Sequence, residues 1–259
     1  MKILFIDLDG TLLTDEKQIT QESKNALESC RENGILVGFI TARTTRKLWE
    51  LIQLVPCDFV ASYDGALIEV SSGGKFKTIL NNCLDRQVAF DIIEDLSNLT
   101  NCDVFAYFEP FYLMNSTVSS NETNTLLQYN QVREQLLGCQ RIRGRFLSRQ
   151  NPCEFYPNMP VDVYAENNDI VIRAIGANKQ TAVKAILRHF EINKEAAVAI
   201  GDGEPDIEMF NECGVGIAMG NAPVSVKRAA TLVTDTNNNN GVAKAINLLL
   251  SEGEDSRLL

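Results

Sequence analysis

The sequence predicts an α/β fold with a parallel sheet, interrupted by an inserted α+β domain. In the first and last parts of the chain, short apolar runs alternate with segments of helical spacing, which is typical of strand–helix–strand units. Between them the pattern changes to paired strands and isolated helices over about 100 residues, the size of a domain. We therefore expect a core formed by residues 1–81 and 178–259, with the insertion at 82–177.

The first part of the chain alternates buried strands with amphipathic helices. Strands are expected at residues 3–6, 35–40 and 58–62, and helices at 21–33 and 44–55. Thr20 is the expected N-cap of the first helix, and Gly34 is its stop signal. A hairpin is expected where the runs 66–70 and 75–79 flank a Ser-Ser-Gly-Gly turn. Such alternation implies right-handed crossovers and therefore a parallel sheet.

The insertion and the last part of the chain differ in pattern. Within the insertion we expect helices at 85–99 and 125–137 and strands at 103–109, 112–116, 161–165 and 170–175. Residues 146–160 show no clear pattern. Alternation then resumes, with strands at 196–200, 214–219 and 231–234 and helices at 179–190, from Pro205, at 224–230 and at 242–250. The Asn-rich run 237–241 is expected to be a turn-rich loop before the last helix.

Composition and charge exclude several classes of protein. The 259-residue chain has a net charge of −10, which argues against a nucleic-acid binder. No apolar run reaches the ~18 residues that a membrane span needs. The N-terminus reaches Asp7 after a short apolar run, so we expect no signal peptide. The seven cysteines form no CxxC pair, which indicates reduced thiols and a cytoplasmic protein.

Histidine chemistry is also excluded. The single histidine, His189, lies in a helical stretch and is expected on the surface of that helix. No second histidine is available for a Ser-His pair or a His-metal site. Carboxylates must therefore carry most of the chemistry.

Two carboxylates, Asp7 and Asp9, follow the first apolar strand directly. Unpaired charge is costly to bury, whereas the ends of parallel strands are where ligands bind. Further polar residues stand at comparable places: Thr41 after the second strand, Asp202 and Asp206 after a later strand, and Lys179 at a helix start. Each alone is compatible with a turn, a helix cap or a solvated surface, but parallel strands bring all of them to one edge.

Carboxylates gathered at one edge need a counter-cation, because like charges raise one another's pKa. Oxygen ligands without His or Cys favour a hard ion, and Mg²⁺ is the natural choice. The Thr41 hydroxyl and the Lys179 ammonium suit a substrate phosphate. Asp7 can then attack phosphorus as a covalent nucleophile, while Asp9 protonates the leaving oxygen and later activates water.

Four motifs, in this order, resemble those of the haloacid dehalogenase (HAD) superfamily. They are Asp7-Leu8-Asp9-Gly10-Thr11, Thr41-Ala42-Arg43, Lys179 and Gly201-Asp202-Gly203-Glu204-Pro205-Asp206. The insertion resembles the type-IIB cap of the Cof-like sugar-phosphate phosphatases, and the segments 216–222 and 240–243 resemble theirs too. The resemblance spans the whole chain. It implies a Rossmann-like parallel-sheet core and an inserted α+β cap that closes over it.

The resemblance also implies a role for each motif residue. Asp7 is expected to be the nucleophile and a Mg²⁺ ligand, and Asp9 the general acid and base, which binds the metal through its carbonyl. Asp202 is expected to be a second carboxylate ligand, with Asp206 supporting the metal shell. Four residues are expected to hold the phosphoryl group, namely Leu8 through its backbone, Thr41, Ala42 through its amide, and Lys179. Two more, Arg43 and Asn221, are expected to contact substrate or support the site.

Three positions depart from the family pattern. Ala42 stands where the family has Gly, a mild change if the backbone amide binds phosphate. Asp64 replaces an Asn before Gly65 and adds an acid near the site. Pro205 replaces an Asn whose side chain contacts phosphate, so we expect weaker phosphate binding or a different local helix start.

The leading hypothesis is a Mg²⁺-dependent phosphatase of small phosphorylated metabolites, with sugar phosphates the first candidates. A phosphomutase would use the same aspartyl-phosphate and return the phosphoryl group to substrate. A dehalogenase is disfavoured because it has no use for Asp9 or the metal cluster. A metabolite-binding protein that has lost turnover is supported only by Pro205.

The expected partner is a small phosphorylated metabolite rather than nucleic acid or a membrane, and the sequence says nothing about oligomeric state. Four residues of the insertion are candidates for substrate selection, although each is equally compatible with an ordinary surface position: Tyr107, Tyr112, Arg143 and Arg145.

Overall fold

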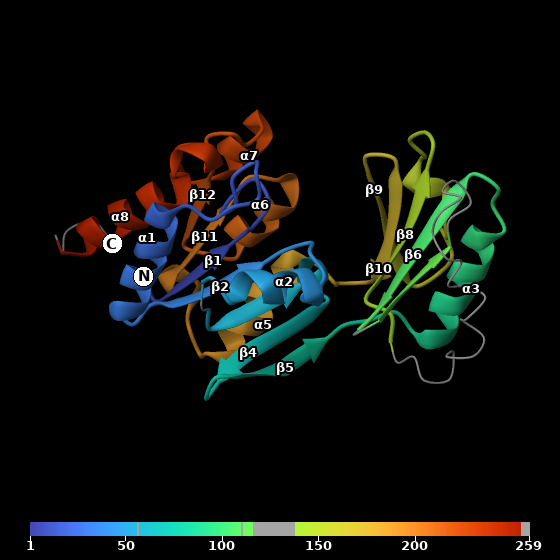
Figure 1. Cartoon of the computed structure of the whole chain (residues 1–259), viewed down its shortest axis with the longest axis horizontal. Coiled ribbons are helices and arrows are strands. Elements are labelled where there is room, and N and C mark those ends of the chain that lie inside the picture. Colours follow the sequence, from blue (N-terminus) through green and yellow to red (C-terminus); the bar gives the residue numbers. More distant parts are fainter. Residues whose placement is uncertain (56, 110, 116–137, 255–259) are drawn as a thin grey trace. The chain divides into compact units, whose positions relative to one another are not determined.

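The computed structural model describes residues 1–55, 57–109, 111–115 and 138–254, and the chain divides into two compact units (Figure 1). Unit 1 comprises Met1–Leu80 and Asn178–Leu259, and unit 2 comprises Asn81–Ala177. Unit 2 is thus inserted between the two segments of unit 1. In the part of the chain that is described, no helix is long and apolar enough to cross a bilayer.

Unit 1 contains an eight-stranded sheet in the order β13-β12-β11-β1-β2-β3-β4-β5. Strands β13 to β3 of this order run parallel, and β4 is antiparallel to β3. Strand order reverses at β1, which pairs with β2 on one side and β11 on the other. In open α/β sheets such a switch point opens a crevice at the carboxyl ends of the strands. The strands span Ile3–Ile6 (β1), Leu36–Ile40 (β2), Phe59–Ser62 (β3), Leu67–Ser72 (β4), Lys75–Asn81 (β5), Ala197–Gly201 (β11), Val215–Ala218 (β12) and Leu232–Val233 (β13).

Helices cover both faces of this sheet. Apolar residues of α1, α2 and α8 pack in one buried cluster with β1 and β2, and α1 lies beside α8 (Figure 1). Apolar residues of α5, α6 and α7 form a second cluster with the opposite faces of the strands. The helices span Gln21–Glu32 (α1), Thr45–Ile52 (α2), Lys179–His189 (α5), Glu204–Asn211 (α6), Val224–Ala229 (α7) and Gly241–Glu254 (α8).

Local sequence signals determine several of these boundaries. The Thr20 hydroxyl accepts the Ser23 N–H at 3.2 Å, which confirms the predicted N-cap of α1. All four residues of β1 are fully buried, as expected for a strand covered on both faces. His189 ends α5 on the exposed surface, in accordance with the prediction. The Asn-rich segment forms a short 3₁₀ turn, Asn237–Asn239, before α8.

Gly38 in β2 is required by close packing. A Cβ at this position would lie 2.3 Å from both the ring and the carbonyl oxygen of Phe59 on β3. We expect Gly38→Ala to lower the free energy of unfolding by about 1–3 kcal/mol, because the buried strands must separate to admit the methyl group. Urea unfolding measures this, and an unchanged midpoint would contradict the packing argument.

Unit 2 contains a five-stranded antiparallel sheet in the order β7-β6-β8-β10-β9. Helix α3, Arg86–Ser97, packs against β6 and β8, and Asp85 caps it by accepting the Gln87 N–H at 2.9 Å. The predicted helix at 125–137 lies outside the described residues. The strands span Cys102–Phe108 (β6), Phe111–Asn115 (β7), Arg141–Phe146 (β8), Val161–Glu166 (β9) and Asp169–Ala174 (β10).

Strand β8 has no counterpart among the predicted elements. Its sequence, Arg-Ile-Arg-Gly-Arg-Phe, alternates with period two, but only Ile142 and Phe146 are apolar members of the alternation. Gly144 faces the helix side, where a Cβ would lie 3.1 Å from Cys102 Sγ. The sequence therefore does not predict β8, a central strand of the sheet, because its arginines and glycine weaken the apolar alternation by which strands are recognised.

Candidate active site

The carboxyl ends of three adjacent strands meet at one edge of the unit 1 sheet. Asp7 follows β1, Thr41 follows β2 and Asp202 follows β11, and these strands are hydrogen-bonded neighbours. The Asp7 N–H donates to the Ile200 carbonyl at 3.0 Å, which extends the pairing one residue beyond β1. The predicted convergence of these residues is therefore present.

A cluster of carboxylates forms at this edge. Asp7, Asp202 and Asp206 each offer an oxygen atom, and these oxygens lie within 4.8 Å of one another. Lys179, at the start of α5, donates from Nζ to Asp7 Oδ1 and to Asp206 Oδ1, at 2.6 Å each. The Lys179 side chain is only 5% exposed, so its charge is directed at these two acids. The helix start is fixed by Asn178, whose side chain accepts the Thr181 N–H.

Asp206 organises the backbone of the cluster. Its Oδ2 accepts the N–H groups of Asp202 and Gly203, at 2.9 and 2.8 Å, while its Oδ1 accepts from Lys179. Helix α6 begins at Glu204, one residue before the predicted start, with Gly203 as its N-cap. Pro205 therefore occupies the second position of the helix, where its missing N–H would have had no helical partner.

Asp202 is supported by residues from two other segments. The Thr11 hydroxyl donates to its Oδ1 at 2.7 Å, and the Asn221 amide lies 3.4 Å from its Oδ2. Asn221 also donates to the Gly10 carbonyl at 2.8 Å. Gly10 has a φ of +84°, and a Cβ there would lie 2.4 Å from Asp202 Oδ2, so only glycine fits. Thr11 was not among the predicted site residues, although it lies inside the first motif.

The Asp9 carboxylate points to two cations instead of the cluster. It accepts from Arg43 Nε at 2.6 Å, from Arg43 Nη2 at 2.8 Å, and from Lys17 Nζ at 2.8 Å. Burial raises the pKa of Asp9, but the hydrogen bonds from Arg43 and Lys17 outweigh it and lower the pKa to about 2. Arg43 thus binds Asp9, the residue expected to be the general acid and base. Lys17 was missed, because only the tight turn at Thr14–Gln18 returns it toward Asp9.

The electrostatics of the cluster favour a bound cation. Burial raises the pKa of Asp7 to about 8; Lys179 lowers it in part, whereas Asp206 and Asp202 add to the rise. Burial lowers the pKa of Lys179, yet the negative charges of Asp206, Asp7 and Asp64 outweigh this and raise it. One ammonium therefore faces several acids. The donor set consists of oxygen atoms alone, which fits a hard divalent ion such as Mg²⁺.

The predicted phosphate-binding residues lie beside the cluster. Leu8 is fully buried directly after Asp7, and Thr41 is 1% exposed, with its hydroxyl accepting the Arg43 N–H at 3.1 Å. Ala42 lies between Thr41 and Arg43 on the loop that follows β2. Asp64, the added acid, is buried with a φ of 58°, and its N–H donates to the Thr41 carbonyl at 2.8 Å.

The candidate specificity residues of the insertion belong to the unit 2 sheet. Arg143 pairs with Glu166 and with Asp169, and Arg145 pairs with Asp169 at 3.1 Å. Both arginines line a cavity of about 400 Å³. The Arg141 guanidinium lies over the ring of Tyr107, with its Cζ 5.2 Å from the ring centroid. The side chain of Tyr112, on β7, lies outside the described residues.

Comparisons with known proteins agree with this geometry. The family model of haloacid dehalogenase-like hydrolases matches residues 4–138 and 154–246. A curated Bacillus subtilis relative, 5-amino-6-(5-phospho-D-ribitylamino)uracil phosphatase YcsE, is 30% identical over 248 residues and covers 95% of this chain and 94% of its own length.

Solved structures show the same fold over nearly the whole length. The HAD phosphatase BT1666 from Bacteroides thetaiotaomicron is 25% identical with a TM-score of 0.79, covering 95% of this chain and 94% of its own. The HAD subclass IIB sugar phosphatase BT4131 is 23% identical with a TM-score of 0.78, covering 96% of this chain and 99% of its own. The chain therefore belongs to the haloacid dehalogenase-like hydrolases, and it is an enzyme of the phosphatase branch of that family.

Proposed function

We propose that this enzyme is a Mg²⁺-dependent phosphatase that hydrolyses small phosphorylated metabolites through an aspartyl-phosphate on Asp7. The observation that carries the proposal is the position of Asp7. It stands at the end of the central strand, held by Lys179 and clustered with Asp202 and Asp206. A nucleophilic carboxylate beside a buried ammonium is suited to attack an anionic phosphoryl group.

In the first step, an Asp7 carboxylate oxygen forms a bond to phosphorus while the bond between phosphorus and the leaving alkoxide oxygen breaks. Asp9 gives that oxygen a proton, which it regains from water in the second step. Because Arg43 and Lys17 lower the pKa of Asp9 to about 2, its carboxyl group must leave these partners to be protonated for the first step. In the second step, water attacks the phosphorus of the aspartyl-phosphate, Asp9 takes the proton of the water, and the phosphorus–Asp7 bond breaks. The pairing of Asp9 with Arg43 and Lys17 favours its ionised form, which is the form that the second step requires.

Lys179, the Thr41 hydroxyl and the backbone amides of Leu8 and Ala42 are proposed to hold the phosphoryl oxygens. Asp7, Asp202 and the Asp9 carbonyl are proposed to hold Mg²⁺, with Asp206 as support. When bound, the ion neutralises charge on the phosphoryl oxygens. Because Asp206 already accepts from Lys179 and from two backbone N–H groups, its contribution is to orient those groups.

The substrate class is proposed to be sugar phosphates or related small metabolites. Support comes from relatives whose names include a phosphoribitylamino-uracil phosphatase and a sugar phosphatase. A phosphomutase would use the same Asp7 chemistry and would release an isomer instead of phosphate. A cytoplasmic location is part of the same proposal, supported by the six cysteines whose side chains the structure describes, which are all free.

The experiment is a phosphate-release screen over sugar phosphates, nucleotides and cofactor phosphates. We expect release from at least one class with Mg²⁺, loss of release in EDTA, and recovery when Mg²⁺ is restored. Detection of an isomeric phosphate ester without free phosphate would favour the mutase. Binding of a phosphorylated metabolite without turnover under any condition would favour a binding protein and contradict the proposed function.

A further inference from the structure

The Asn-rich segment Asn237–Asn240 is connected to the catalytic segment by hydrogen bonds that the proposed chemistry does not use. The 3₁₀ turn at its start follows β13 and precedes α8, far from Asp7 in sequence. Asn237 is nevertheless buried, at 6% exposure, whereas Asn238 and Asn239 beside it are exposed. A buried amide side chain requires partners, and those of Asn237 lie in the segment that carries Asp7 and Asp9.

Two asparagines hold the chain that follows the nucleophile. Asn237 Nδ2 donates to the Leu13 carbonyl at 3.0 Å and to Asp15 Oδ1 at 3.1 Å. Asn238 Nδ2 donates to Asp15 Oδ2 at 2.8 Å, and Asn238 Oδ1 accepts the Asp15 N–H at 3.0 Å. The turn after Asp9 is thus hydrogen-bonded, at Leu13 and at Asp15, to a segment more than 220 residues away along the chain.

A third connection runs from the same segment to the cluster of acids. The Asn237 N–H donates to Asn221 Oδ1 at 3.0 Å. This contact fixes the orientation of the Asn221 amide, so that its Nδ2 faces the Gly10 carbonyl at 2.8 Å and Asp202 Oδ2 at 3.4 Å. Asn237 is therefore linked both to the turn after Asp9 and, through Asn221, to Asp202.

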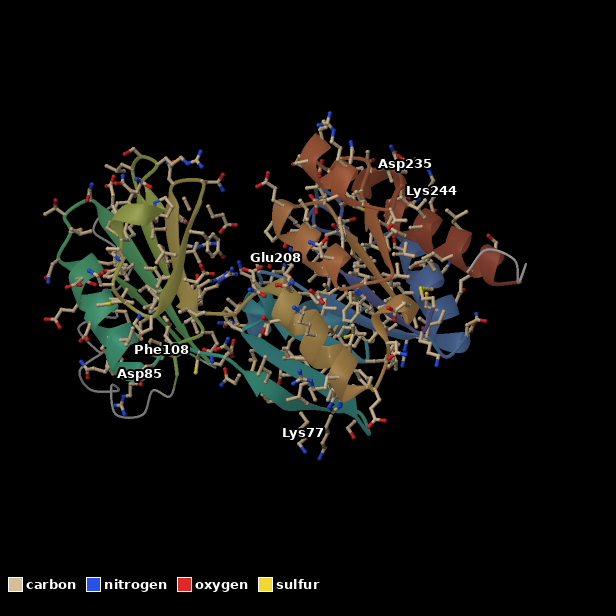
Figure 2. The ribbon with its side chains drawn as sticks, turned by 180° about the vertical axis from the view of Figure 1, so that it is seen from behind. Lys77, Asp85, Phe108, Glu208, Asp235 and Lys244 are labelled. Carbon is tan, nitrogen blue, oxygen red and sulfur yellow. The ribbon has the colours of Figure 1, made fainter. Side chains whose placement is uncertain are left out.

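The segment is itself joined to its neighbours by further contacts. Asp235 pairs with Lys244 of α8 at 2.6 Å, and the two side chains lie together in Figure 2. The Thr234 hydroxyl donates to the Gly241 carbonyl at 2.8 Å. A Cβ at Gly241 would lie 2.2 Å from the Asp235 carbonyl oxygen, so the chain closes tightly on itself there.

We propose that Asn237 is a positioning residue. Its side chain holds the 8–18 segment, and its backbone N–H orients Asn221 toward Asp202, in the geometry that metal and phosphate binding require. The expected effect on kcat rests on the function proposed above. The expected effects on hydrogen exchange and on Mg²⁺ binding do not depend on turnover. Groups that orient ligands in this way typically change metal affinity or activity by about 10- to 100-fold when removed.

The test compares Asn237→Ala with Asn239→Ala. Asn237→Ala removes the side-chain bonds to Leu13 and Asp15 and keeps the backbone bond to Asn221, so it tests the hold on the 8–18 segment. Asn239 is an exposed asparagine of the same turn, and its side chain lies 3.5 Å from Asp235 Oδ1. In the metal-free protein, we expect Asn237→Ala to accelerate hydrogen exchange of the Leu12 and Leu13 amides, which donate to the Asp7 and Leu8 carbonyls. The Mg²⁺ concentration that gives half-maximal thermal stabilisation should rise about 10- to 100-fold. The kcat should fall by a similar factor with little change in KM, and Asn239→Ala should match wild type throughout.

A second variant keeps the proposal testable if Asn237→Ala fails to fold. Asp15→Ala removes the exposed carboxylate that both asparagines hold, and Glu16→Ala, also exposed, is its control. If Asn237→Ala, or Asp15→Ala where the first variant does not fold, leaves exchange and the Mg²⁺ midpoint at wild-type values, the proposal is wrong. A different outcome would contradict the proposed function and leave the positioning role standing: wild type binds Mg²⁺ but releases no phosphate, while Asn237→Ala still exchanges Leu12 and Leu13 faster than wild type.

Discussion

Asp7→Asn is expected to lower kcat for phosphate release by roughly 10⁴- to 10⁶-fold, the range found when a covalent nucleophile is removed. The amide has the shape of the carboxylate but cannot form the aspartyl-phosphate. The measurement is steady-state phosphate release with Mg²⁺, on whichever substrate the screen identifies. Asp91→Asn is the matched control, because Asp91 is an exposed acid of α3 in unit 2. Normal turnover by Asp7→Asn would contradict the proposal that Asp7 forms a covalent aspartyl-phosphate.

The same variant has a second consequence, of opposite sign, for stability. Burial raises the pKa of Asp7 to about 8 in the folded, metal-free enzyme, far above its ordinary value of 3.8. The folded state therefore prefers the protonated acid, and ionisation destabilises it as the pH rises from about 4 to about 8. Metal-free Asp7→Asn should match wild type near pH 4 and unfold at a higher temperature near pH 8.

Much of this site could be predicted from sequence because its residues follow buried strands. The apolar run Ile3–Ile6 identifies β1, and the position after it identifies Asp7. The same argument finds Thr41 after β2 and Asp202 after β11, since parallel strands end at one edge. Those predictions depend on local pattern and on topology, both of which a single sequence contains.

The sequence does not reveal the contacts of polar side chains whose partners are brought near only when the chain turns or folds back. Lys17 reaches Asp9 only because the backbone of Thr14–Gln18 turns back on itself. Asn237 reaches Leu13 across 224 positions, and nothing in an asparagine run indicates its partner. Strand β8 was missed for a different reason, because its alternation is carried by arginines that pair with acids and aromatic rings on the same sheet. Spacing identifies faces and ends, whereas the partners of polar side chains depend on the folded chain.

Lys179 gives the last prediction with a large effect, because it is the one basic side chain that the described cluster of three acids contacts through hydrogen bonds. Lys179→Met keeps the aliphatic stem and removes the charge. We expect kcat to fall about 10²- to 10³-fold, as when a preorganised donor to a reacting anion is lost. The free energy of unfolding should fall by about 3–5 kcal/mol, because buried carboxylates lose their partner. Lys184→Met is the matched control, since Lys184 is exposed on the same helix and pairs with Glu212.

The pH dependence of stability distinguishes loss of the Lys179 charge from simple loss of packing. The pKa of Lys179 is raised in the folded protein, so its contribution to stability is complete at neutral pH and is lost only in strongly alkaline solution. Without it, the pKa of Asp7 should rise further. Metal-free Lys179→Met should therefore lose more thermal stability than wild type as the pH rises through about 8, where Asp7 of the folded wild type ionises, and Mg²⁺ should restore part of it. A loss equal at every pH would contradict this electrostatic role, because the effect of the charge must grow as Asp7 ionises.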